Sequence, residues 1–439
     1  MAELKYQRTL DVRYDVDVFV VGGGPAGCAA AIAAARQGAK VFLAEREGCL
    51  GGLGTAGMVP AYMTYGDGEH ILSAGIGQEI RERMWKIGRY EENGMAGTTG
   101  IRVEALKRAY DEMLAEAGAA FMLDTQMTDV VMDGARVDYC VMSAKSGMYA
   151  VKAKVYIDCT GDGDLCAWAG VPFRKGDENG QTMPATLCSL WSGIEFDKRT
   201  VRDDSRVQEA YDDGVFSKLD LHLSGFWQSA RHVGGGNIGH VWGVDGTDES
   251  TLTSALVEGR KMFDEYETYY RKYIPGFENV ELVTTANMMG IRESRRIQGE
   301  YTLNLEDFKA RANFPDEVGR YCYPVDIHPS DNSPEAMAQF KKMFEGLRYQ
   351  KGESYGVPYR MIVPVGVDNL LMAGRCVSTD RYLQASMRVM PGCYITGQAA
   401  GAAAAQCART GKAPRDANVH DIQKALKEMG QYLPNYKEK

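Results

Sequence analysis

The chain has 439 residues, 45% of them hydrophobic and 25% charged, a balance typical of a globular protein with room for two domains. Its formal net charge of −9 disfavours nucleic acid and anionic membrane surfaces as partners. The 10 cysteines form no CxxC pair and the 6 histidines form no HxH or HExxH motif, so we expect no metal site.

The first sixty residues predict a strand, a helix and a second strand, over 16–21, 25–37 and 40–44. Between the first strand and the helix, the segment 22–27 reads G-G-G-P-A-G, which matches the G-x-G-x-x-G pattern. An acidic residue, Glu45, stands at the tip of the second strand. This context favours a dinucleotide-binding βαβ unit over a glycine-rich turn that binds no nucleotide.

Each residue of this motif has a physical role in binding a dinucleotide. Gly22 permits a tight turn, Gly24 lets a pyrophosphate approach the backbone, and Gly27 lets the helix pack against the strand. The helix N-terminus offers free N–H groups to the phosphates. Glu45 is placed to accept hydrogen bonds from ribose hydroxyls and to repel a 2′-phosphate, which disfavours NADP. The contacts predicted from this unit are Gly22, Gly24, Pro25, Ala26, Gly27 and Glu45.

A second glycine-rich loop, 48–57, follows the acidic residue directly. It indicates more backbone packed against a cofactor, and a flexible loop remains open as the alternative. The candidate contacts in and before this loop are Arg46, Gly51, Gly52 and Thr55.

Over these residues the sequence resembles the glutathione-reductase-like flavoprotein superfamily. It is most similar to the bacterial FAD-dependent oxidoreductase family, which is related to fumarate reductase and succinate dehydrogenase flavoproteins. The βαβ unit alone indicates only ADP, and the resemblance implies that the cofactor is FAD. It also implies that the segment through Gly51 and Gly52 runs past the pyrophosphate towards the isoalloxazine ring.

The middle of the first domain predicts an amphipathic helix, 101–117, and then strands over 120–123, 127–132, 136–142 and 148–157. The resemblance implies that the backbone near Met127 contacts adenine. The last strand ends in C-T-G-D-G, which resembles the family's second fingerprint, with Thr160 and Gly161 close to the ADP part of FAD. We expect loop or helix-capping roles for Asp162 and Asp164 rather than metal binding.

A change of pattern near Ala167 marks a second domain. We expect strands over 186–194 and 241–244, a glycine-rich turn over 234–236, and a helix over 252–273 whose aromatic stripe packs in a core. A further helix is predicted from Ser333. Its apolar stripe is Met337, Phe340, Phe344 and Leu347.

Two clusters in this domain are candidates for catalysis. His232 and His240 lie on the glycine-rich segment 231–240 and are able to move a proton, with a plain surface loop as the alternative. Arg292 lies in M-G-I-R-E-S-R-R-I, which resembles a segment of the family. The fumarate-reductase relatives suggest that such an arginine orients a carboxylate, hydroxyl or carbonyl, or donates a proton. A structural Arg–Glu network is the alternative.

The last third of the chain returns to the cofactor. A strand over 369–373 precedes Gly374 and Arg375, and a helix of small residues is predicted to begin at Gly392. A helix N-terminus at Gly392 and Cys393, together with Arg388, would stabilise negative charge on reduced flavin. Many superfamily members carry an acidic residue where Arg375 stands, and this departure weakens any transfer of their ribityl contacts.

These patterns predict an α/β protein: a Rossmann-like FAD/NAD(P)-binding domain of the three-layer ββα type with an inserted α+β substrate domain. The expected division is an FAD-binding domain over 1–166 and 357–410, a substrate domain over 167–356, and a C-terminal helical tail over 411–439. The expected cofactor-binding set also includes Gly374, Arg375, Arg388, Gly392 and Cys393.

The predicted activity is hydride transfer between flavin N5 and a small polar metabolite such as a hydroxy acid, sugar or polyol. A flavin monooxygenase or hydroxylase, a non-catalytic flavin-binding redox sensor, and a thiazole-synthase-like protein using bound NAD are the alternatives. The electron donor or acceptor is left open, as is a homo-oligomer. The most apolar long stretch, 394–408, is too short for a bilayer span and no signal peptide is evident, so we expect a soluble, cytoplasmic protein.

Overall fold

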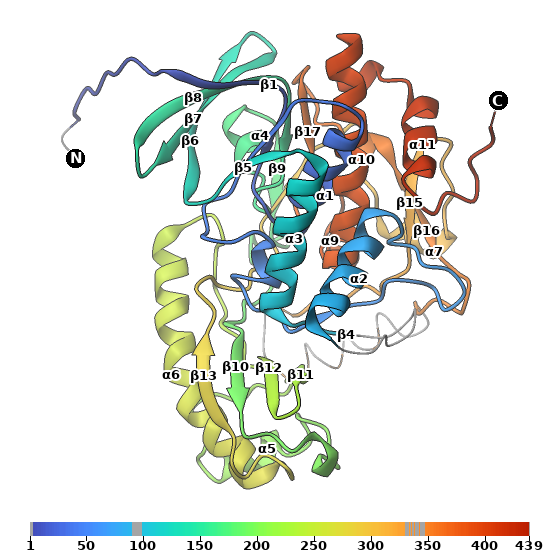
Figure 1. Cartoon of the computed structure of the whole chain (residues 1–439). Helices are drawn as coiled ribbons and strands as arrows, with labels where there is room; N and C mark the ends of the chain where they lie inside the picture. The colour runs from blue at the N-terminus through green and yellow to red at the C-terminus, as the bar shows by residue number, and fades with distance from the viewer. Residues whose placement is uncertain are drawn as a thin grey trace.

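The computed structural model describes residues 3–89, 99–329 and 347–438, together with Ser333, Glu335, Ala338 and Lys342. Figure 1 shows two lobes: the upper one holds the large sheet with α1, α3 and α10, and the lower one holds a small sheet beside α6. Residues Met337, Phe340 and Phe344 of the helix expected from Ser333 lie outside the described residues.

The upper lobe is built on a 7-stranded sheet with the order β5-β2-β1-β8-β7-β6, in which β17 also pairs with β8. Its strands are β1 (Val12–Val21), β2 (Val41–Ala44), β5 (Ala120–Met122), β6 (Thr125–Asp133), β7 (Arg136–Ala144), β8 (Gly147–Asp158) and β17 (Leu370–Met372). The run Val18–Val21 is apolar on both faces because β1 lies in the middle of the sheet, between β2 and β8 in parallel register.

Strand β8 joins two kinds of pairing. Its first residues pair antiparallel with β7, and its last residues pair in parallel with β1 and β17. The antiparallel part, β6-β7-β8, folds over one face of the parallel strands, so that β6 comes close to β2. This three-layer arrangement confirms the predicted Rossmann-like α/β fold.

The helices of the upper lobe cover the parallel strands. They are α1 (Pro25–Arg36), α2 (Ile76–Gly88), α3 (Val103–Ala117), α10 (Met390–Thr410) and α11 (Val419–Glu428). The backbones of α1 and α10 approach closely because α10 carries glycines at the contact. A Cβ built on Gly397 would lie 2.2 Å from the carbonyl oxygen of Ala26, and one on Gly401 would lie 2.1 Å from that of Ala30. The last third of the chain is thereby fixed on the first helix.

The lower lobe has an antiparallel sheet with the order β11-β12-β10-β13. Its elements are α5 (Val207–Asp212), α6 (Glu249–Tyr273), β10 (Ser189–Ser192), β11 (Gly225–Ala230), β12 (Val233–Asn237) and β13 (Glu281–Thr285). Phe263, Tyr266 and Tyr270 of α6 are buried in its core, which confirms that the aromatic stripe is a packing surface.

Two expectations for this lobe were wrong. The glycines 234–236 form the middle of strand β12 rather than a turn, because their missing side chains leave room for Phe226, Trp191 and Pro60. Residues 241–244 do not form a strand, and Val241 makes only an isolated bridge with Ala185.

Several short elements complete the fold. They are β3 (Ala61–Tyr62), β4 (Thr99–Gly100), α4 (Asp164–Trp168), β9 (Phe173–Lys175), β14 (Arg295–Ile297), α7 (Leu305–Ala310), β15 (Glu317–Tyr321), β16 (Tyr355–Pro358) and α9 (Arg381–Met387), with 3-10 helices at Gly52–Gly54, Phe196–Lys198, Tyr359–Ile362 and Pro414–Asp416. Strand β14 pairs with β9, and β15 pairs with β16.

The buried apolar residues form two cores. The lower core gathers residues from Ala185 to Ile291, whereas Ile297, Val318 and Val357 belong to the upper core. This distribution favours an inserted unit shorter than the predicted 167–356, and the boundaries stay a prediction.

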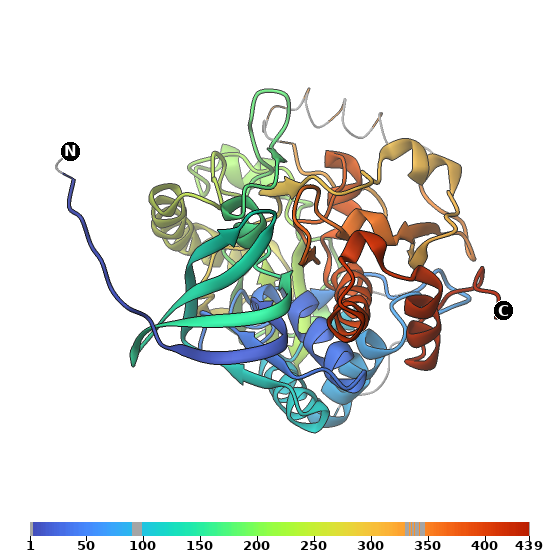
Figure 2. The same cartoon turned by 90° about the horizontal axis from the view of Figure 1, so that it is seen from above.

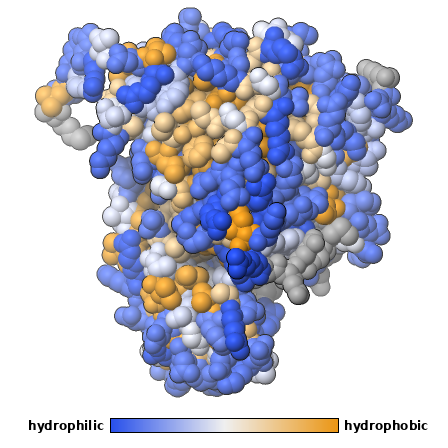
Figure 3. Space-filling view, in the orientation of Figure 1, coloured by the Kyte–Doolittle hydropathy of each residue, from blue (hydrophilic) through white to orange (hydrophobic). Residues whose placement is uncertain are grey.

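The surface in the orientation of Figure 1 is mainly hydrophilic, with apolar residues in the middle of the upper lobe and in a smaller patch on the lower lobe (Figure 3). None of the helices in the described part of the chain combines the length and the apolar character that a membrane crossing needs. The N-terminal residues before β1 run away from the body of the molecule, as the view from above shows (Figure 2).

Candidate functional site

A cavity of about 490 Å³ runs from the carboxyl ends of β1 and β2 to the lower lobe's sheet, where Trp227 of β11 and Asn237 of β12 line it. This position, beyond the carboxyl ends of parallel strands, is where open α/β sheets bind ligands. The volume lies in the range of small-molecule sites. The cavity therefore connects the predicted nucleotide site with the predicted substrate domain.

The glycine motif forms one end of the cavity. A Cβ on Gly24 would meet no atom within 4 Å, so this glycine leaves open space at the N-terminus of α1. That helix has no side-chain cap, and its first N–H groups are therefore available to a ligand. Gly27 does not line the cavity, because its Cα packs against the carbonyl oxygen of Gly22, only 1.8 Å from an added Cβ. This geometry fits the pyrophosphate of a dinucleotide.

Glu45 lies at the same end, and its side chain is held rigidly. Its carboxylate accepts hydrogen bonds from the backbone N–H groups of Gly23 at 2.6 Å and Glu47 at 2.8 Å. Burial raises the pKa of Glu45, and these two N–H groups oppose the shift. The carboxylate keeps further lone pairs for ribose hydroxyls. Thr125, Gln126 and Met127 line the wall nearby, where the adenine contact was predicted.

The second glycine-rich loop is ordered against the first. Gly51 has a φ of +104° and donates its N–H to the carbonyl oxygen of Gly23 at 2.8 Å. The Thr55 hydroxyl donates to the Leu50 carbonyl oxygen at 2.6 Å. Gly52 lines the cavity, whereas Gly51 and Thr55 shape the loop behind it. The loop is therefore part of the wall rather than a free surface loop.

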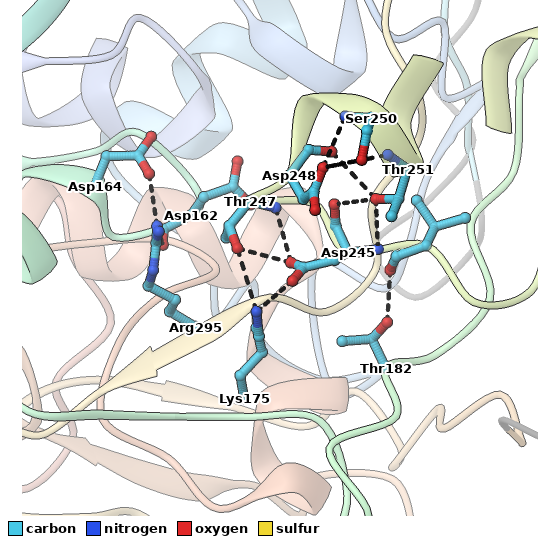
Figure 4. Close-up of polar contacts among 11 residues, drawn as sticks. Asp162, Asp164, Lys175, Thr182, Asp245, Thr247, Asp248, Ser250, Thr251 and Arg295 are labelled. Atoms are coloured by element: carbon cyan, nitrogen blue, oxygen red, sulfur yellow. Dashed lines mark hydrogen bonds and ion pairs between the residues drawn. The ribbon is translucent and has the colours of Figure 1, made fainter. Parts of the chain in front are cut away.

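Ion pairs fix the second fingerprint, which follows β8. Asp162 pairs with Arg375 at 2.6 Å, and the same guanidinium donates to the carbonyl oxygen of Gly161 at 2.9 Å. Asp164 pairs with Arg295 at 2.6 Å, as Figure 4 shows. Both aspartates line the cavity. Partial burial, together with the charge of Asp162, raises the pKa of Asp164 to about 6.

Figure 4 also shows how this region is joined to the lower lobe. Lys175 of β9 pairs with Asp245, which in turn accepts a hydrogen bond from the backbone N–H of Thr247 at 2.9 Å. Asp248 then caps the N-terminus of α6. These contacts join β9, which pairs with β14 at Arg295, to the helix that supports the lower core.

The predicted helix near the reactive end of the cofactor begins earlier than expected. Helix α10 starts at Met390, and the N–H of Cys393 is already bonded to the carbonyl oxygen of Val389 at 3.0 Å. Gly392 does not line the cavity, because an added Cβ would lie 2.5 Å from the carbonyl oxygen of Met387. The remaining predicted contacts in this part, Gly374, Arg375, Arg388 and Cys393, do line it.

Arg292 reaches the cavity in the lower half. Arg292 does not belong to a strand, because residues 291–294 lie between the isolated bridge at Gly290 and strand β14. Its guanidinium donates to the carbonyl oxygen of Pro184 at 2.9 Å, to the hydroxyl of Thr186 at 2.8 Å and, more weakly, to the amide oxygen of Asn237 at 3.4 Å.

Among the described residues, no carboxylate lies within ion-pair distance of Arg292, and Asp326 and Asp220 act on its charge only from farther away. The side chain is 7% exposed. Burial, followed by the nearby charge of Arg388, lowers its pKa to about 10, so the side chain is cationic at neutral pH. The Arg–Glu network expected as an alternative exists, but it joins Glu293 to Arg296 and leaves Arg292 out.

Three of the histidines meet beside Arg292. We call His222, His240 and His328 the histidine cluster; their ring centroids lie 5.0 to 6.1 Å apart. His222 and His328 line the cavity, and His240 lies behind them. The other predicted histidine, His232, is exposed at the β11–β12 turn, where its ring faces the carbonyl oxygen of Ile194 at 3.2 Å. It is not part of the cavity wall.

Four residues of this region were not predicted from the sequence: His222, His328, Asp220 and Asp326. A signal was present: Asp-Leu-His at 220–222 and Asp-Ile-His at 326–328 share the spacing Asp-x-His. Neither segment belongs to a named helix or strand, so periodicity gave no reason to select them.

The comparisons with known proteins agree with this architecture. A family model described as FAD dependent oxidoreductase matches residues 17–426. The thiamine thiazole synthase of Pyrobaculum arsenaticum is 31% identical over 204 residues, which is 43% of this chain and 72% of that protein. An uncharacterized protein in the nifH2 5′ region of Methanosarcina barkeri is 32% identical over 183 residues, 39% of this chain and 96% of that protein.

Among solved structures, the flavin-dependent brominase Bmp2 covers 94% of this chain and 83% of its own, with a TM-score of 0.50 and 13% sequence identity. At this identity the likeness concerns the fold alone. It spans both lobes of the chain and agrees with the Rossmann-like arrangement of the upper one.

Proposed function

Since the chain belongs to the FAD-dependent oxidoreductase family, we propose that it moves a hydride between FAD and a small 2-hydroxy acid or the corresponding keto acid. FAD is held by the glycine motif, Glu45 and the second fingerprint, and when bound it supplies the hydride acceptor or donor at N5. The chain's own residues supply the rest: they bind the substrate, orient it and move its proton.

The unpaired charge of Arg292 carries this proposal. A cation removed from water costs several kcal/mol unless an anion compensates it. Its neutral acceptors, Thr186 and the Pro184 carbonyl group, fix the orientation of the guanidinium without neutralising it. A substrate carboxylate would bind the planar fork of donors and remove the uncompensated charge. Sugars and polyols offer no such anion, so the arginine favours the hydroxy acid within the predicted metabolite classes.

The histidine cluster contacts the hydroxyl end of the substrate in this proposal. His328 and Arg292 both line the cavity, and the charge of Arg292 acts on the His328 ring. A carboxylate on Arg292 would therefore place an adjacent hydroxyl within reach of a proton acceptor. Arg388 lies at the same end of the cavity, where its charge is paired with that of Asp326 at 3.2 Å, so that Arg292 remains the cation available to the substrate.

Anaerobic reduction of the purified yellow protein tests the proposal. The panel compares 2-hydroxy acids with their amides and with polyols, and loss of the visible flavin absorbance reports hydride transfer. We expect the acids alone to bleach the flavin. Bleaching by polyols but not by acids would refute the assignment of substrate class, and oxygen uptake with hydroxylation of an aromatic would favour a monooxygenase.

Variants of the arginine sharpen this test. Arg292→Met should retain FAD but lower kcat/KM for the acid by about 30-fold or more, equivalent to roughly 2 kcal/mol, because the carboxylate loses its partner. Arg292→Lys should recover only part of the lost kcat/KM, since lysine lacks the paired N–H donors of a guanidinium. Arg108→Met, on the exposed face of α3, is the matched control. An Arg292→Met enzyme with unchanged kcat/KM would contradict the proposal.

A further inference from the structure

The histidine cluster forms a chain of hydrogen bonds that ends at the cavity. The carboxylate of Asp220 lies 2.9 Å from Nδ1 of His240, and Nε2 of His240 lies 3.0 Å from Nδ1 of His328. All three residues are buried: Asp220 is 6%, His240 4% and His328 6% exposed. The chain therefore runs from a buried carboxylate, through one imidazole, to a second imidazole in the cavity wall.

The carboxylate determines where each ring carries its proton. An ionised Asp220 only accepts hydrogen bonds, so Nδ1 of His240 must donate to it. Nε2 of a neutral His240 then has a free lone pair and accepts from Nδ1–H of His328. This leaves Nε2 as the unprotonated nitrogen of neutral His328, because the Asp326 carboxylate, at 3.6 Å, lies beyond hydrogen-bond distance of Nε2, whereas Asp220 lies within that distance of His240. Asp220 is itself held by the backbone N–H of His222 at 3.2 Å.

The surroundings favour the neutral form of both rings before a substrate binds. Burial lowers the pKa of His240 and, to a larger extent, that of His328, where Arg292 adds to the effect. Asp326 acts in the opposite direction, with its carboxylate 3.6 Å from Nε2 of His328. Among the described residues, the ionisable groups that act on the pair are Asp220, His222, Arg292 and Asp326. Tyr323 donates a hydrogen bond to Asp326 at 3.1 Å, and Arg388 pairs with the same carboxylate at 3.2 Å.

We propose that His328 is the acid–base residue of the site and that His240 and Asp220 are positioning residues that keep its Nε2 free for the substrate proton. The identity of the substrate rests on the function proposed above. When a hydroxyl is oxidised, its O–H bond breaks and the proton goes to Nε2 of His328. The neighbouring C–H bond breaks, its hydrogen and two electrons leave as the hydride for FAD, and the C=O bond forms.

The arrangement couples binding to proton transfer. An empty site holds His328 neutral, partly because of the charge of Arg292. A substrate carboxylate on Arg292 neutralises that charge, so the His328 ring becomes a stronger base only when the anion is bound. The resulting imidazolium would have a hydrogen-bond acceptor on one side, His240, and a carboxylate on the other, Asp326.

Nitrogen NMR of ring-labelled histidines in the FAD-loaded protein tests the proton arrangement without any substrate. His240→Gln and His328→Gln assign the signals. We expect wild-type His240 and His328 to carry their protons on Nδ1 at neutral pH and to stay neutral well below pH 6.5, the ordinary histidine value. Asp220→Asn should move the proton of both rings from Nδ1 to Nε2, because the introduced amide can donate to Nδ1 of His240. A proton on Nε2 of wild-type His328 would overturn the proposal.

Kinetics with the acid identified in the panel completes the test. His328→Gln and Asp220→Asn should lower the rate of flavin reduction by about 100-fold or more while FAD stays bound. Wild-type kcat/KM should be flat above pH 6.5 and fall on the acid side. His420→Gln, at a partly exposed position of α11 outside the cavity wall, is the control.

The outcomes separate the two proposals. If acids bleach the flavin of His328→Gln as fast as that of the wild type, His328 is not the acid–base residue, although the function stands. If dithionite bleaches the flavin but no acid in the panel does, the proposed function fails, whatever the NMR result.

Discussion

Two glycines of one motif serve different physical purposes at the residue scale. Gly24 leaves space into which an added methyl group would project without touching the protein, whereas Gly27 leaves room for the carbonyl oxygen of Gly22. Gly24 therefore leaves room for a ligand, and Gly27 is required by the packing of the fold. The two positions of the pattern G-x-G-x-x-G are thus not equivalent, in keeping with the separate roles that the sequence assigned to them.

Alanine substitutions separate these roles. Gly24→Ala should weaken FAD binding by about tenfold or more, with little change in the stability of the apoprotein, because its φ of −67° suits alanine. Gly27→Ala should lower the free energy of unfolding by at least about 2 kcal/mol, because the methyl group overlaps a backbone oxygen. Fluorimetric FAD titration and urea unfolding of the apoproteins measure the two effects. Equal losses of stability in both variants would contradict this division.

At the element scale, the contact between α1 and α10 joins the beginning and the end of the chain. Both helices consist mainly of small residues, and α10 is buried along most of its length. Their short side chains allow the backbones to approach, and this places Arg388 and Cys393 opposite the glycine motif around one cavity. The site thus depends on helix packing between two segments that lie more than 350 residues apart in the sequence.

Gly401→Ala tests this packing. In an exposed helix the change would stabilise the protein by about 1 kcal/mol. Here the added methyl group would lie 2.1 Å from the carbonyl oxygen of Ala30, so we expect a net loss of roughly 1–3 kcal/mol. Thermal unfolding measures the change, and Thr410→Ala, at the exposed end of the same helix, is the control. A stabilised Gly401→Ala protein would show that the helices separate easily.

At the scale of the whole molecule, the two lobes share a cavity whose buried histidines link stability to pH. Because burial lowers the pKa of His240 and His328, the unfolded chain binds more protons than the folded one below about pH 6.5. Their contribution to stability is therefore complete above that value and is lost as the pH falls.

Removing one ring should reduce this dependence. The free energy of unfolding of the wild type should fall more steeply between pH 7 and about pH 5 than that of His328→Gln, with a limiting slope of about 1.4 kcal/mol per pH unit for each neutral ring. Guanidinium unfolding at a series of pH values measures the slopes. His420→Gln should follow the wild type; the same slope in His328→Gln would mean that His328 is protonated in the folded protein.

The sequence by itself determined the parts of the protein that local patterns encode. The glycine motif and Glu45, predicted to bind a nucleotide, lie at one end of the cavity. Apolar periodicity and turn residues predicted β1, α1, the meander and α6. These predictions succeeded because strand, turn and helix signals act over a few residues. The segment 289–297 was found in the same way, and the structure placed Arg292 in the cavity wall.

Only the tertiary structure decided the rest. Asp220, His240 and His328 lie in three separate segments, and no local pattern states that their rings meet. The burial of Arg292 without a carboxylate is a property of its surroundings, as is the exposure of His232. The glycines of β12 were misread because a strand without side chains is stable only when aromatic residues of neighbouring strands cover it. The end of the cavity that carries the glycine motif is thus encoded locally, whereas Arg292 and the histidine cluster come together only through folding.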